Sequence, residues 1–161
     1  MEHTLQHPLG LAHLVTALLA VLIGALVIFT KKGTLRHKWI GRGYVVLMFA
    51  VNLSAFLIYE LFDGFGLFHW MAVFSLLSVL VGYFAAWNRS PGWQVWHAYF
   101  MSGSYVGLIA ALAAETLTRY VSLPFLAGVA VVSITVIVIG VFLMNRFIPR
   151  LVINPVQADL S

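Results

Sequence analysis

Long apolar runs separated by short polar segments dominate the pattern of the chain. A bilayer core about 30 Å thick needs about 20 apolar residues in a helix that rises 1.5 Å per residue. Lipid offers no partners to backbone N–H and C=O groups, so each run must form a helix rather than an open strand. The pattern predicts five spans, at residues 9–29, 39–61, 68–87, 97–117 and 123–144.

Proline residues mark the ends of the predicted helices. Pro8 suits a first helical position, whereas Pro149 and Pro155 are expected to end the last helix. The connections between the runs are short, which favours antiparallel neighbours. We therefore expect one transmembrane unit over residues 1–150 and a short cytoplasmic tail over residues 151–161.

Composition strengthens this interpretation. Of the 161 residues, 62% are hydrophobic and 9% are charged, whereas about a quarter of an average soluble domain is charged. That balance excludes a disordered chain and an ordinary cytosolic enzyme. The chain has no cysteine, which excludes disulfides, thiolate metal sites and thiol nucleophiles. The predicted fold class is an all-α polytopic membrane protein.

The cations indicate an orientation. With five spans, eight of the nine Lys and Arg residues fall on one side of the membrane, and only Arg119 falls on the other. Cytoplasmic loops carry an excess of Lys and Arg, so the N-terminus is expected outside and the C-terminus in the cytoplasm. The eight residues are Lys31, Lys32, Arg36, Lys38, Arg42, Arg89, Arg146 and Arg150.

Four histidines follow a repeated plan. His13 lies in the outer part of the first span and His37 at the inner start of the second, while His69 and His97 take the same places in the next two spans. A parallel repeat is related by an axis along the membrane normal. The repeat predicts a core of four helices with the fifth outside it, and it pairs His13 with His69 and His37 with His97.

Paired imidazoles are the ligands of a six-coordinate b-type heme, and bundle cores hold cofactors between facing helices. The pattern therefore predicts two hemes and an electron-transfer protein without catalytic residues. Arg36, Arg42 and Arg89 lie at the depth of the inner pair, where they contact heme propionates or anionic lipid headgroups. The alternative is a non-enzymatic membrane subunit or assembly factor whose histidines are purely structural.

A second group of potential ligands lies outside. His3, His7, Glu60 and Asp63 combine imidazole and carboxylate groups, which suit zinc or copper. This group predicts a metal site on the outer face as a third hypothesis.

The fifth run is almost entirely β-branched and aliphatic and contains no histidine. Residues 123–144 therefore face lipid beside the bundle, or they dock another membrane subunit.

The pattern Gly-Thr-x-x-His-(Lys/Arg)-x-x-Gly-Arg at residues 33–42 resembles a bacterial family of small multi-span membrane proteins known only as a domain of unknown function. The resemblance continues at residues 66–69 and 97–101 and covers most of residues 9–150. It implies an integral protein of the bacterial inner membrane without an assigned activity. The plan of four histidines is similar, in architecture alone, to transmembrane cytochromes b of the ascorbate-dependent kind.

Overall fold

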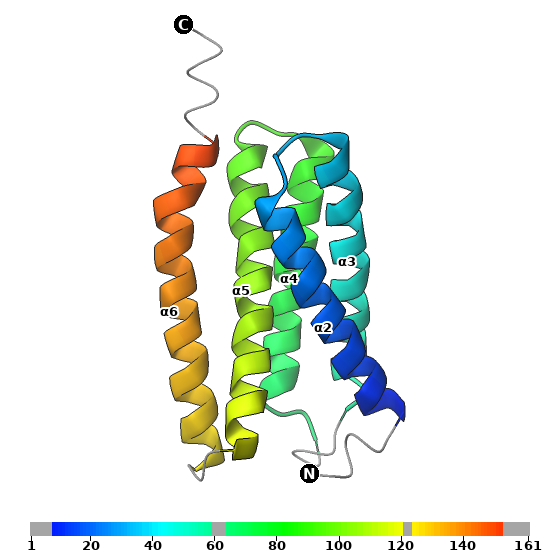
Figure 1. The fold of residues 1–161 in the computed structure, drawn as a ribbon, viewed down its shortest axis with the longest axis vertical. Helices are drawn as coiled ribbons and strands as arrows, with labels where there is room; N and C mark the ends of the chain where they lie inside the picture. The colour runs from blue at the N-terminus through cyan, green and yellow to red at the C-terminus, as the bar shows by residue number, and fades with distance from the viewer. Residues whose placement is uncertain (1–7, 59–63, 121–123, 153–161) are drawn as a thin grey trace, which may run out of the picture. The chain divides into compact units, whose positions relative to one another are not determined.

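The computed structural model describes residues 8–58, 64–120 and 124–152, and every regular element within these ranges is an α-helix. The predicted all-α class is therefore confirmed. The helices are α2 (Pro8–Phe29), α3 (Leu35–Ala55), α4 (Leu67–Asn88), α5 (Trp93–Tyr120) and α6 (Phe125–Val152) (Figure 1).

Four of these helices are long and apolar enough to cross a membrane, namely α2, α4, the Trp93–Leu117 part of α5, and α6. α3 is long enough, at about 31 Å, but it carries Arg36, Lys38 and Arg42 in its first turns. The predicted polytopic character is confirmed. Of the five predicted spans, α3 is the one whose composition does not by itself mark a membrane crossing.

The chain forms two compact units, residues 1–76 and residues 77–161, and the division falls inside α4. In the first unit α2 packs against α3, and in the second α5 packs against α6. Each of these two pairs is an antiparallel hairpin (Figure 1), as the short connections predict.

The bounds of α3 differ from the predicted span of 39–61. The helix begins earlier because Thr34 is its N-cap, and the Thr34 Oγ1 atom accepts a hydrogen bond from the His37 N–H at 3.2 Å. It ends at Ala55, where the next residues close tighter turns, such as the bond of 3.0 Å from the Leu57 N–H to the Ser54 carbonyl. Apolarity continues past the end of the helix, so hydropathy alone does not locate the helix end.

The turn between α2 and α3 depends on two local features. Gly33 has a φ of +79°, a left-handed conformation that glycine adopts without steric cost. The Lys32 ammonium donates hydrogen bonds to the carbonyls of Val27 and Ile28, at 2.8 and 2.7 Å. The last four carbonyls of a helix lack intrahelical partners. The Val27 carbonyl also accepts the Thr30 N–H, at 3.3 Å, and Lys32 caps the end of α2 through both carbonyls. Partial burial lowers the pKa of Lys32 below its ordinary value.

Close contact between α5 and α6 rests on small residues. A Cβ placed on Gly140 would lie 2.5 Å from Val106 Cγ1 of α5. Van der Waals packing rather than the hydrophobic effect drives helix association in lipid, and small residues allow that approach. The buried residues of α6 are Gly128, Val129, Ser133, Gly140 and Ile148.

The predicted end of the last helix at Pro149 is wrong. α6 continues through Pro149 to Val152. Proline removes one backbone hydrogen bond, but here it lies in the last turn, so little of the helix follows it. Its neighbour Ile148 is 6% exposed, and this packing keeps the final turn in place. Pro155 lies outside the described residues.

Candidate functional site

His97 has the clearest local geometry among the four histidines. It lies in the second turn of α5, and its Nδ1 atom is 2.8 Å from the Gly82 carbonyl oxygen of α4. A carbonyl oxygen only accepts hydrogen bonds, so Nδ1 carries the proton and the neutral ring has its lone pair on Nε2. Metal-ligating histidines are oriented by this kind of bond between the second ring nitrogen and a carbonyl.

His13 of α2 forms a hydrogen bond to α3. Its Nδ1 atom is 2.8 Å from the Ser54 Oγ atom. A hydroxyl both donates and accepts, and the Ser54 Oγ atom also lies 2.7 Å from the Ala50 carbonyl and 3.0 Å from the Val51 carbonyl. The bond connects two helices of the first unit without fixing the His13 tautomer.

His69 has the tautomer opposite to that of His97. The Gly66 N–H donates to His69 Nδ1 at 3.0 Å, so Nδ1 holds the lone pair and the proton is on Nε2. His69 is the third residue of α4, and its side chain reaches back to the residue before the helix, as the acidic or amide residue of a capping box does. It is 3% exposed and stacks on Phe65 with ring centroids 4.9 Å apart. These contacts give His69 a structural role, and its tautomer does not suit an iron ligand.

His37 is the third residue of α3 and is half-buried, with a buried Nδ1 atom. It belongs to the first compact unit and His97 to the second. The pairing of His37 with His97 therefore stays a prediction. His13 and His69 belong to one unit, but His69 carries its proton on Nε2, which argues against that pair as two equivalent iron ligands.

The three arginines predicted to contact propionates are exposed. The Arg42 guanidinium lies over the Trp39 ring, 5.0 Å from its centroid, and that of Arg89 lies 6.0 Å from the Trp93 centroid. At 3.6 residues per turn, Arg42 projects about 140° around α3 from His37. The Arg42 guanidinium therefore contacts the Trp39 indole on the exposed side of α3 and is directed away from His37.

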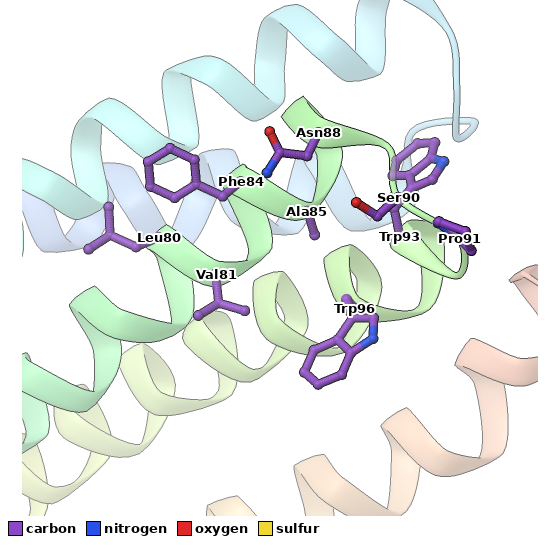
Figure 2. Close-up of a pocket in the computed structure, with 9 residues that line it drawn as sticks. All are labelled: Leu80, Val81, Phe84, Ala85, Asn88, Ser90, Pro91, Trp93 and Trp96. Carbon is purple, nitrogen blue, oxygen red and sulfur yellow. The ribbon is translucent and has the colours of Figure 1, made fainter.

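A pocket of about 380 Å³ lies at the turn between α4 and α5. Figure 2 shows aromatic and aliphatic walls with two small polar side chains at the turn. The Trp93 ring is part of this wall and lies 6.2 Å from the His97 ring. The short connection between α4 and α5 predicts that these ends lie together, but hydropathy does not report the space between their side chains, so the sequence did not predict the pocket. The lining residues are Leu80, Val81, Phe84, Ala85, Asn88, Ser90, Pro91, Trp93 and Trp96.

The pocket lining contains no ionisable side chain. Apolar walls with a few neutral polar groups suit an uncharged, largely apolar molecule. The Asn88 amide and the Ser90 hydroxyl supply both donors and acceptors for its polar end.

The predicted outer metal ligands His3, His7, Glu60 and Asp63 all lie outside the described residues. Within residues 8–58, 64–120 and 124–152, no group of three or more His, Asp or Glu side chains is placed to hold a metal ion.

A family model with the description "Predicted membrane protein (DUF2306)" matches residues 10–153 of the chain. No curated protein and no solved structure matches it. The match confirms the resemblance to an uncharacterised multi-span family, and it extends over all five helices.

Proposed function

Because the chain belongs to the DUF2306 family of membrane proteins, which has no assigned activity, we propose that it is a b-type heme protein that carries electrons in the membrane. His97 is the first axial ligand in this proposal. The heme would supply the one-electron chemistry, while the chain would ligate, orient and bury it.

The single observation that carries the proposal is the hydrogen bond of 2.8 Å between His97 Nδ1 and the Gly82 carbonyl. This bond holds the ring in one orientation and places the lone pair on Nε2, which would be the nitrogen that binds the heme iron. A Cβ on Gly82 would lie 2.8 Å from the Met101 side chain, so α4 and α5 are in close contact here. This contact makes the position of the imidazole rigid.

The second ligand follows from the sequence rather than from a contact. His37 is the candidate, because the repeat pairs it with His97. His69 is excluded because its Nδ1 accepts the Gly66 N–H, and His13 then lacks its predicted partner. We therefore propose one heme rather than two.

The pocket beside His97 suggests the class of electron partner. Trp93 contributes to the pocket and lies beside the His97 ring. Neutral polar groups above apolar walls favour an uncharged ring with an apolar tail, such as an isoprenoid quinone. The same proposal places the N-terminus outside a bacterial inner membrane and the C-terminus in the cytoplasm, since eight of nine cations then face inward.

The test is the visible spectrum of detergent-purified protein from heme-supplemented cells. We expect a Soret band and an α-band that shift on reduction with dithionite. His97→Ala and His37→Ala should each lose the bands. The matched control is His69→Gln, which keeps an acceptor in the capping position and should retain full heme. A colourless, folded wild-type protein would overturn the proposal.

The alternative function is a non-enzymatic membrane subunit without a cofactor. One observation favours it, namely the apolar and strongly exposed outer side of α6, where Val131, Ile134 and Phe142 are 62%, 60% and 63% exposed. Such a surface suits lipid or a second membrane protein. Colourless protein that purifies in a stable complex, with the complex lost on Ile134→Ala/Phe142→Ala, would support this alternative.

A further inference from the structure

One side of α3 combines cations with exposed apolar side chains. At 3.6 residues per turn, Leu35, Lys38, Trp39 and Arg42 all project within an arc of about 100°, and we call this set the basic-aromatic face. Leu35 is 74% exposed and Trp39 is 67% exposed. Tyr44, on the opposite side of the helix, is 2% exposed. The basic-aromatic face is thus the solvent or lipid side of α3.

Two of the four side chains in the basic-aromatic face are cations, and none of the four is acidic. The basic-aromatic face therefore presents a net positive charge to its surroundings. An anionic partner complements this charge, whereas a zwitterionic headgroup brings a cation of its own.

The Arg42 side chain is directed back toward the start of α3, because its guanidinium lies over the Trp39 ring one turn earlier, at 5.0 Å. Long cationic side chains adopt this course when their stems lie in lipid and their charges reach the headgroups. Lys38 and Arg42 both lie in the first half of α3, so side chains directed toward the start of the helix carry their charges toward the level of the phosphates.

Exposed apolar residues also lie on this side of α3, further toward its C-terminal end than the cations. Val46 and Leu53 project in the same direction as Leu35, and they are 68% and 55% exposed. We call these two residues the apolar stripe. Along α3 the basic-aromatic face comes first and the apolar stripe follows. A molecule with a phosphate at one end and a hydrocarbon chain at the other could therefore contact both.

We propose that the basic-aromatic face and the apolar stripe together bind one anionic phospholipid. The phosphate lies between Lys38 and Arg42, Trp39 packs on the glycerol region, and an acyl chain follows Val46 and Leu53. This proposal is independent of heme, because the residues involved project away from His37 and none of them belongs to the proposed ligand set.

The experiment is native mass spectrometry of the full-length protein, titrated in detergent with phosphatidylglycerol or with phosphatidylcholine. We expect phosphatidylglycerol to bind with one-to-one stoichiometry and phosphatidylcholine to bind far more weakly. Lys38→Gln/Arg42→Gln should weaken the apparent affinity for phosphatidylglycerol about 30-fold, since each cation near an anionic headgroup contributes about 1 kcal/mol. The matched control, Arg146→Gln/Arg150→Gln, removes two exposed cations from α6 and should leave the affinity unchanged.

A second measurement needs no variant. Thermal unfolding of the wild type should shift upward with phosphatidylglycerol but not with inorganic phosphate, and 1 M salt should remove most of the shift. Equal binding of the two lipids would overturn the proposal, as would undiminished binding by the Lys38→Gln/Arg42→Gln variant. A shift produced by inorganic phosphate alone would show an anion site that does not recognise lipid.

Discussion

Gly140→Ala tests whether the contact between α5 and α6 depends on the absence of a side chain. The added Cβ would lie 2.5 and 2.6 Å from the two γ-carbons of Val106 and 3.1 Å from its Cβ. Carbon atoms in contact are normally about 3.5–4.0 Å apart. Valine has one strongly preferred rotamer in a helix, so Val106 cannot withdraw, and the two helices must separate.

The magnitude follows from two opposing terms. Overpacking a tight contact costs about 1–3 kcal/mol, while replacing glycine by alanine within a helix gains about 0.5–1 kcal/mol. We therefore expect Gly140→Ala to lower the free energy of unfolding by about 1–2 kcal/mol. Gly103 of α5 supplies the matched control, because a Cβ there would meet only Met144 Cε, at 4.0 Å. Gly103→Ala should be neutral or slightly stabilising.

The assay is thermal unfolding in mild detergent, followed by tryptophan fluorescence. A double-mutant cycle with Val106→Ala isolates the contact, and Gly140→Ala/Val106→Ala should recover most of the stability that Gly140→Ala loses. The reasoning is refuted if Gly140→Ala and Gly103→Ala have the same effect, or if Val106→Ala gives no recovery.

Three further predictions concern local contacts. Thr34→Ala removes the side-chain acceptor of the His37 N–H and should destabilise the first unit by about 1 kcal/mol, as measured by chemical unfolding, whereas Thr34→Ser should not. Lys32 has a lowered pKa because it is partly buried. Between the lowered pKa and the ordinary value of 10.5 the unfolded state binds more protons, so the free energy of unfolding should rise with pH in that range. A pH series of melting temperatures measures this rise, which should be absent in Lys32→Met. Gly82→Ala places a Cβ 2.8 Å from the Met101 Cγ and Sδ atoms and 3.1 Å from the Met101 backbone nitrogen. Because the methionine side chain is flexible, the cost should be smaller than that of Gly140→Ala. Gly82→Ala/Met101→Ala should relieve the side-chain part of this cost but not the backbone contact, as thermal unfolding will show.

Errors at the ends of helices have a common cause. The predicted span of 39–61 followed apolarity, but α3 begins where Thr34 caps it and ends at Ala55. Likewise Pro149 was expected to stop the last helix, and α6 continues to Val152. Hydropathy reports where a segment can lie in lipid, whereas capping bonds and packing decide where a helix starts and stops. For α2 and α4 the helix bounds lie within one residue of the predicted spans of 9–29 and 68–87.

The amino-acid sequence by itself determined that this chain is helical and belongs in a membrane. Both properties are local, because a long apolar run must satisfy its own backbone hydrogen bonds in lipid. The family could also be identified from a short string around His37, and the family model confirms it over residues 10–153.

Only the tertiary structure decided the hydrogen-bond partners of His13 and His97. They are Ser54 and Gly82, 41 and 15 residues away, and no pattern in the sequence predicts them. The four histidines are chemically identical in the sequence, yet the structure separates His69, which caps a helix, from His97, whose ring presents a basic nitrogen. The N–H of Gly66, three residues earlier, fixes the tautomer of His69, whereas a carbonyl of the neighbouring helix α4 fixes that of His97, because a histidine takes its tautomer from the groups that fold against it.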